Sequence, residues 1–111
     1  MFGIGNTEIA PKELKRRLDG GEKLPVLDVR EDKELAICKL DDTMHIPMGE
    51  LQARIAELEP YKGQEIVVMC RSGGRSGQCV QYMRKLGFNA INLAGGILAW
   101  AKDVDPTVAK Y

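Results

Sequence analysis

Residues 65–76 read EIVVMCRSGGRS, in which an apolar run leads into one cysteine, two glycines and two arginines. The run at 65–69 is β-branched and apolar after its first residue, which predicts a central strand buried on both faces, as in parallel sheets. Apolar residues then recur at helical spacing until Gly87, which predicts a helix over 76–86. A strand, a short loop and a helix form the repeating unit of a parallel α/β sheet.

The rest of the chain alternates between extended and helical patterns. Extended segments are predicted over 2–5, 24–29, 44–46 and 90–93, and helical segments over 31–35, 50–58 and 96–102. One more helix is predicted with Asn6 or Thr7 as its cap, Pro11 in its first turn and Gly20 at its end. This alternation predicts an α/β fold with a central five-stranded parallel sheet and helices on both faces.

Length and composition limit the possible classes of protein. The 111 residues suit a single domain over 1–111, with its core at about 5–102 and a tail over 103–111 that is expected to be loosely ordered after Asp105-Pro106. Sixteen basic and sixteen acidic side chains cancel, so no overall charge favours nucleic acid or an anionic membrane as a partner. The first residues resemble no signal peptide, and no apolar run approaches the ~20 residues of a membrane span.

The cysteines indicate the compartment. Cys38, Cys70 and Cys79 are odd in number and widely spaced, which argues against a disulfide framework and for a reducing compartment. We therefore expect a cytoplasmic protein. A zinc site is not expected, because no Cys-x2-Cys pair is present and His45 is the one histidine.

The loop after the central strand is suited to holding a thiolate. Its backbone N–H groups can point at the Cys70 sulfur if Gly73 and Gly74 adopt angles that a side chain would block. The N-terminus of the following helix adds its positive end, and Arg71 and Arg75 add two positive charges. All of these features favour the thiolate, which is the nucleophilic form of cysteine.

The size of the loop indicates what else it can hold. Four residues separate Cys70 from Arg75. So short a loop leaves space for roughly one atom beyond the cysteine sulfur, whereas a loop one residue longer would fit a tetrahedral phosphate. The spacing therefore favours a persulfide, Cys–S–S⁻, whose charged outer sulfur the loop amides would solvate.

Four segments together resemble the rhodanese (sulfurtransferase) family. They are 65–88 with the cysteine loop, 26–31 with an Asp-x-Arg signature, His-Ile-Pro at 45–47, and Gly-Gly-x-x-x-Trp within 92–100. The resemblance covers about residues 5–102, and four motifs in the right order are far more specific than one. One departure is that Met44 precedes the histidine, where the family commonly has glycine, and Met48-Gly49-Glu50 follows Pro47.

The resemblance implies a single-domain sulfurtransferase with Cys70 as the catalytic residue. In such a cycle the thiolate takes sulfur from a donor such as thiosulfate and passes it to cyanide, a thiol or a protein, without a metal or organic cofactor. The segments around Glu34, His45 and Trp100 further resemble the rhodanese domain of sulfur-carrier adenylyltransferases. That narrower resemblance implies a small sulfur-carrier protein as a possible partner.

The remaining loop residues are expected to bind the substrate or shape the loop: Arg71, Ser72, Gly73, Gly74, Arg75 and Ser76. Arg71 is expected to face outward, toward an anionic donor or a partner's acidic tail. Arg75 is expected to hold the loop, or a carboxylate of Asp28 or Glu31. Asp28 and Arg30 lie two apart on a strand, so their side chains share a face. A supporting ion pair is the favoured interpretation, with an acid–base pair as the alternative.

Several other residues have two possible roles. Cys79 is predicted to pack in the core, with a resolving thiol for Cys70 as the alternative. Cys38 is expected to be a surface or packing residue rather than a redox group. His45 is expected to be a hydrogen-bonded structural histidine rather than a general base, and Trp100 a packing residue.

Two rival functions stay open. One is a phosphatase or arsenate reductase on the same fold, which the short loop disfavours. The other is a non-catalytic binding module, or a sulfur relay that works only with a docked partner. The intact Cys70-x4-Arg75 loop argues against an inactive module and leaves a relay possible.

Overall fold

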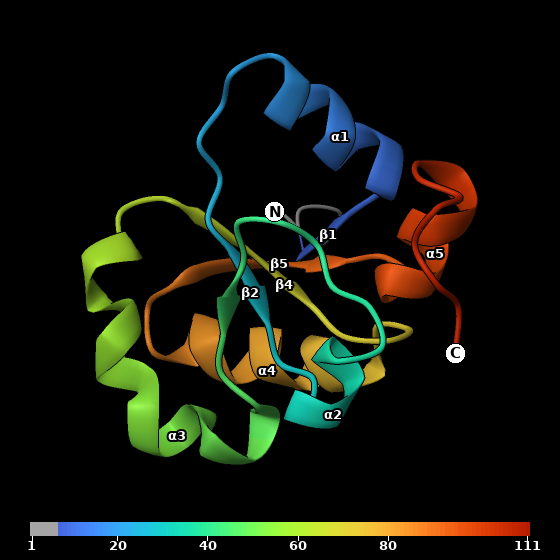
Figure 1. The fold of residues 1–111 in the computed structure, drawn as a ribbon. Coiled ribbons are helices and arrows are strands. Elements are labelled where there is room, and N and C mark those ends of the chain that lie inside the picture. Colours follow the sequence, from blue (N-terminus) through green and yellow to red (C-terminus); the bar gives the residue numbers. More distant parts are fainter. Residues whose placement is uncertain (1–6) are drawn as a thin grey trace.

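The computed structural model describes residues 7–111, and within them the strands form one parallel sheet (Figure 1). The five strands lie in the order β1-β5-β4-β2-β3, which confirms the predicted α/β architecture. Their bounds are β1 Glu8–Ile9, β2 Val26–Asp28, β3 Met44–His45, β4 Glu65–Met69 and β5 Asn89–Leu93.

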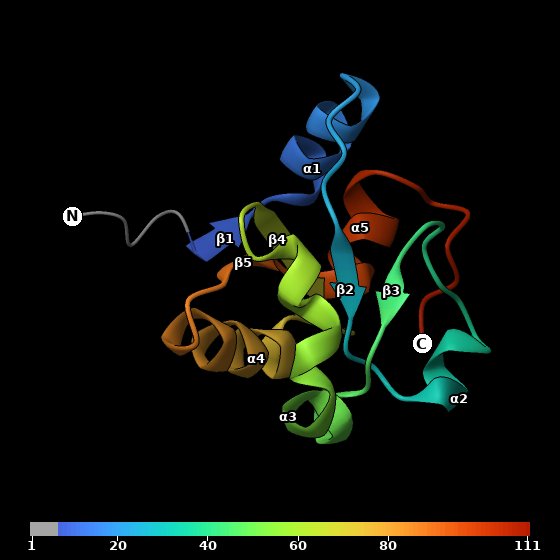
Figure 2. The ribbon, with the colours of Figure 1, turned by 90° about the vertical axis from the view of Figure 1, so that its left-hand side faces the viewer.

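Helices cover both faces of the sheet (Figures 1 and 2). One face carries α1 (Pro11–Asp19) and α5 (Gly96–Asp103). The other carries α4 (Gly74–Lys85) and α3 (Leu51–Arg54), the latter flanked by the 3₁₀ segments η2 (Met48–Glu50) and η3 (Ile55–Tyr61). The short α2 (Asp32–Leu35) follows the carboxyl end of β2.

Alternation along β4 explains why both faces are buried. Ile66, Val68 and Cys70 pack into the cluster beneath α3 and α4, whereas Val67 and Met69 pack into the cluster beneath α1 and α5. Successive side chains of a strand point to opposite faces, so a central strand with helices on both sides must be apolar throughout. Trp100 belongs to the α1/α5 cluster, as predicted.

The N-terminal segment differs from the prediction. The strand expected at 2–5, and Asn6 as a cap, lie outside the described residues. Thr7 does not cap α1, because the strand β1 comes between them. The N-cap is Ala10, which offers no side-chain acceptor, and Pro11 occupies the first turn, where its missing N–H is not needed.

Two helices also differ. The helix predicted over 50–58 divides into η2, α3 and η3. Pro60 lies inside η3, and its ring and missing N–H are incompatible with a regular α-helix at that point. The helix predicted from Ser76 begins instead at Gly74, because the left-handed Gly73 forms its N-cap.

The expectation of a loosely ordered tail is wrong. Val108 and Tyr111 pack against the α1/α5 cluster, and the Tyr111 hydroxyl donates to Glu34 at 2.8 Å. Aromatic and aliphatic burial anchors this segment. Within residues 7–111, no helix combines the length and the apolar character needed to cross a membrane.

Candidate active site

Cys70 lies directly after β4, at the carboxyl edge of the sheet, and its side chain is almost fully buried. Three donors converge on its sulfur. The main-chain N–H groups of Gly73 and Ser76 lie 3.1 and 3.4 Å from Sγ, and the Ser76 hydroxyl oxygen lies 3.3 Å away. The loop therefore directs two of its main-chain N–H groups and one hydroxyl at the sulfur, which is part of the arrangement that its composition predicted.

Hydrogen bonds decide the ionisation of Cys70. Burial raises the pKa of the thiol, but hydrogen bonds from the Ser76 hydroxyl and from the N–H groups of Ser76, Gly73 and Ser72 outweigh it, so the pKa lies below its usual value. These donors stabilise the charged form directly. A thiolate at Cys70 is the nucleophile that the site can offer without a general base.

The two loop arginines are held by other groups. Arg75 donates two hydrogen bonds to Glu34, at 2.7 and 2.9 Å, rather than to Asp28 or Glu31 as the sequence suggested. Arg71 is exposed, as expected, and its Nε and Nη2 donate to the main-chain oxygen of Tyr111. The causes that lower the Cys70 pKa most are hydrogen bonds rather than the charges of these arginines, although Arg75 and the Cys70 thiolate do attract each other.

The two loop glycines have different roles. Gly73 has φ +106°, in the left-handed region that side chains rarely adopt, and its N–H reaches the sulfur. Gly74 has an ordinary φ, and a Cβ placed there meets no atom within 4 Å. The expectation that both positions need glycine holds for Gly73 and is wrong for Gly74.

A second glycine pair, Gly95-Gly96, lies at the start of α5 against the main chain of the cysteine loop. Gly96 has φ +62°, and a Cβ there would lie 2.5 Å from the Arg71 oxygen and 2.6 Å from the Cys70 oxygen. The N–H groups of Ile97 and Leu98, at the start of α5, donate to those same oxygens at 2.9 and 3.1 Å. Sequence reasoning noted this pair as a motif but did not place it at the site.

Asn92 is another supporting residue that the sequence did not reveal. Its Nδ2 donates to the Gly73 carbonyl at 3.1 Å, and its Oδ1 accepts from the Ser76 hydroxyl at 2.6 Å. Asn92 lies on β5 and is buried, so it connects Gly73 and Ser76, whose N–H groups reach the sulfur, to the sheet. The signal for it is a polar residue within an otherwise buried strand.

Asp28 and Arg30 form a fully buried ion pair, with Nη2 2.8 Å from Oδ2. The Arg30 guanidinium also donates to the Cys38 carbonyl at 2.9 Å and to the Tyr111 hydroxyl at 3.0 Å. His45 Nε2 lies 2.7 Å from the Arg30 carbonyl oxygen. These contacts join β2, β3 and the tail. They favour a structural role for the Asp28–Arg30 pair and for His45.

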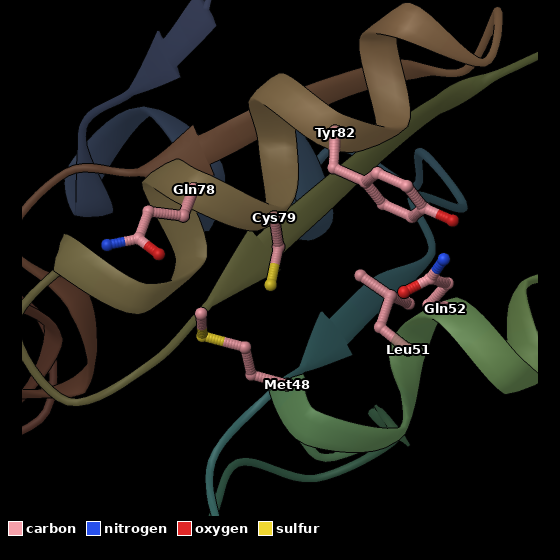
Figure 3. Close-up of a pocket in the computed structure, with 6 residues that line it drawn as sticks. All are labelled: Met48, Leu51, Gln52, Gln78, Cys79 and Tyr82. Atoms are coloured by element: carbon pink, nitrogen blue, oxygen red, sulfur yellow. The ribbon is translucent and has the colours of Figure 1, made fainter.

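Cys79 lines a pocket on the α4 face of the sheet (Figure 3). Its side chain points from α4 toward Met48 and Leu51, and Tyr82 and two glutamines complete the lining. Burial raises the pKa of Cys79 to about 11, and the nearby Cys70 charge adds to this rise. Such a thiol is neutral and unreactive near pH 7, which favours packing over a resolving role.

Comparisons with known proteins agree with this geometry. Residues 10–103 match the family model of the rhodanese-like domain. A protein named sulfurtransferase from Allochromatium vinosum is 36% identical over 103 residues, which cover 92% of this chain and 94% of that protein. The adenylyltransferase and sulfurtransferase MOCS3-2 of Zea mays is 35% identical over 112 residues, covering 96% of this chain and 23% of its own length.

A solved structure shows the same fold. The crystal structure of a rhodanese-like domain protein from Staphylococcus aureus superposes with a TM-score of 0.81 at 28% identity. The match covers 95% of this chain and 98% of that one.

Proposed function

Since this chain belongs to the rhodanese-like domain family, we propose that it is a sulfurtransferase that carries sulfur as a persulfide on Cys70. The observation that supports the proposal most is the convergence of the Gly73 and Ser76 donors on the Cys70 sulfur. The name of the Allochromatium vinosum relative supports the same class of reaction.

In the first step, the Cys70 thiolate attacks the outer sulfur of a donor such as thiosulfate. A bond forms between the two sulfurs, the S–S bond of the donor breaks, and sulfite leaves with the electron pair. Cys70 then carries a persulfide, whose negative charge lies on the outer sulfur. Donors of the loop that are fixed before the reaction stabilise that charge, as the donors of an oxyanion hole do.

In the second step, a nucleophilic acceptor takes the outer sulfur. Cyanide or a thiolate attacks it, the S–S bond of the persulfide breaks, and the Cys70 thiolate leaves. The donors that lower the Cys70 pKa also make it a good leaving group. Neither step requires a metal or an organic cofactor.

The acceptor is the less determined half of the reaction. Alignment of 96% of this chain with MOCS3-2 supports a small sulfur-carrier protein as an acceptor. The three free cysteines support a reducing compartment, and we propose the cytoplasm.

Intact mass spectrometry tests the proposal. After thiosulfate treatment, the protein should gain about 32 Da, one sulfur, which a reductant removes. Cys70→Ser should show no gain and no transfer to cyanide, whereas Cys79→Ser should behave like the unchanged chain. Transfer by Cys70→Ser would contradict the assignment, and turnover of p-nitrophenyl phosphate would favour the rival phosphatase.

A further inference from the structure

Two of the three arginines around Cys70, Arg30 and Arg75, are paired with carboxylates. We infer that Glu34 determines donor specificity, by neutralising Arg75 and so making the site discriminate against doubly charged donors in favour of singly charged ones. This inference rests on the proposed sulfur transfer, because it concerns which donor loads Cys70. It follows from how each cation at the site is paired.

The Arg75–Glu34 pair is the first observation. Two guanidinium nitrogens of Arg75 contact the two carboxylate oxygens of Glu34, at 2.7 and 2.9 Å. Such a bidentate pair fixes both the geometry and the mutual neutralisation of the charges. The Cys70 thiolate is among the influences that raise the pKa of Arg75, so this guanidinium lies within electrostatic reach of the reacting sulfur.

Glu34 is held in place from several directions. Its side chain is 12% exposed, and it accepts hydrogen bonds from the Tyr111 hydroxyl at 2.8 Å and from the Glu31 N–H at 2.8 Å as well as from Arg75. These bonds hold its pKa at about 2, with the Arg75 bonds as the largest cause, so the carboxylate is charged at any working pH. A fixed and permanent negative charge therefore adjoins the loop.

The other two arginines near the loop differ in whether their charge is neutralised. Arg30 and Asp28 neutralise each other in a fully buried pair. Arg71 donates to the main-chain oxygen of Tyr111, and its guanidinium lies 5.1 Å from the centre of the Tyr111 ring. Neither of these partners of Arg71 is a carboxylate side chain, so a donor that approaches Cys70 meets one cation that no such side chain neutralises, Arg71, rather than a cluster of them.

The consequence for donors follows from Coulomb's law. The energy of a donor in the field of Glu34 is proportional to the charge of the donor. Thiosulfate carries two negative charges, whereas methanethiosulfonate carries one and transfers its outer sulfur by the same displacement, with a sulfinate as the leaving group. Comparison of these two sulfur donors therefore separates the effect of donor charge from the chemistry of sulfur transfer.

The test compares kcat/KM for the two donors in the unchanged chain and in Glu34→Gln, at low ionic strength. Removal of the carboxylate should raise kcat/KM for thiosulfate by about threefold to tenfold. The logarithm of the change for methanethiosulfonate should be half as large. Glu57→Gln, which removes a carboxylate of η3 that is paired with Arg54 of α3, is the matched control and should change neither value.

The possible outcomes separate the explanations. Equal changes with both donors, or a loss with both, would show that Glu34 acts only on structure and would overturn the inference. Glu34→Asp, which keeps the charge, should keep the donor preference of the unchanged chain. Failure of the unchanged chain to gain sulfur from either donor would instead overturn the proposed function, and the inference with it.

One further measurement does not depend on Glu34→Gln. Arg71→Gln removes the loop arginine that has no carboxylate side chain as its partner among the described residues, so if Glu34 neutralises Arg75, kcat/KM of this variant should vary little with added sodium chloride for either donor. A steep fall with salt for thiosulfate in Arg71→Gln would show that Arg75 is not neutralised and would overturn the inference even if Glu34→Gln did not fold.

Discussion

Replacement of Gly96 by alanine would test whether the start of α5 shapes the cysteine loop. Gly96 has φ +62°, and an added Cβ would lie 2.5 Å from the Arg71 oxygen and 2.6 Å from the Cys70 oxygen. These are main-chain atoms of the loop itself, so no flexible side chain can move aside. Either the backbone of α5 or the backbone of the loop has to shift.

The magnitude can be estimated from the two separate effects. A left-handed backbone costs a residue with a side chain about 1–2 kcal/mol. Overpacking against a rigid neighbour costs about 1–3 kcal/mol. Gly96→Ala should therefore lower the free energy of unfolding by about 2–5 kcal/mol, a large part of the stability of a domain of this size.

Two measurements follow the two possible shifts. Urea denaturation reports the loss of stability, and the rate of iodoacetamide alkylation at pH 7 reports the thiolate at Cys70. If the loop moves, the hydrogen bonds from Ile97 and Leu98 to the loop carbonyls weaken and alkylation slows. Gly63→Ala is the control, because an added Cβ there meets nothing within 4 Å. If Gly96→Ala matched Gly63→Ala in both measurements, the proposed support from α5 would be refuted.

Two further predictions concern the loop and the second buried thiol. Gly73→Ala should destabilise the fold by about 1–2 kcal/mol and slow sulfur transfer, because Gly73 has φ +106°, whereas Gly74→Ala should be neutral or slightly stabilising; equal effects measured by denaturation would contradict this. Cys70 should be alkylated faster than the similarly buried Cys79, because a lowered pKa raises the thiolate fraction of Cys70. Cys79, with a pKa of about 11, is about one part in a thousand thiolate at pH 8 and should stay unlabelled in peptide mass maps.

Local patterns predicted the strand β4, the loop and the helix α4 because each depends on neighbouring residues. The apolar run sets the strand, and small residues allow the amides to turn toward Cys70. The pattern could not distinguish Gly73 from Gly74, however. Only the backbone shows that one has a positive φ and the other does not.

The partner of Arg75 was beyond sequence reasoning for a different reason. Four carboxylates lie at the end of β2 or just after it, Asp28, Glu31, Asp32 and Glu34, and the sequence does not say which of them binds Arg75. In the structure Asp28 is occupied by Arg30, and Glu31 caps α2 through a capping box. Asp32 Oδ1 lies 3.6 Å from His45 Nδ1. The pairing of Arg75 with Glu34 is therefore set by the three-dimensional contacts of each carboxylate, across 41 positions of sequence.

The contacts of the tail were missed for the same reason. Tyr111 touches Arg30, Arg71 and Glu34, which belong to segments far from it in sequence. Its pairing depends on α5 returning the chain across the carboxyl edge of the sheet. A composition rule for termini cannot detect such a return.

Main-chain and side-chain groups act on different features of the reaction at this site, and this has a consequence for donor specificity. Main-chain N–H groups supply part of the stabilisation of the Cys70 sulfur, and substitutions that keep the backbone in place leave those groups unchanged. The charge that a donor meets, by contrast, depends on side chains such as Glu34 and Arg75, which come from different strand ends. Substitution of Glu34 can therefore change donor preference while the N–H groups of Gly73 and Ser76 still stabilise the Cys70 thiolate.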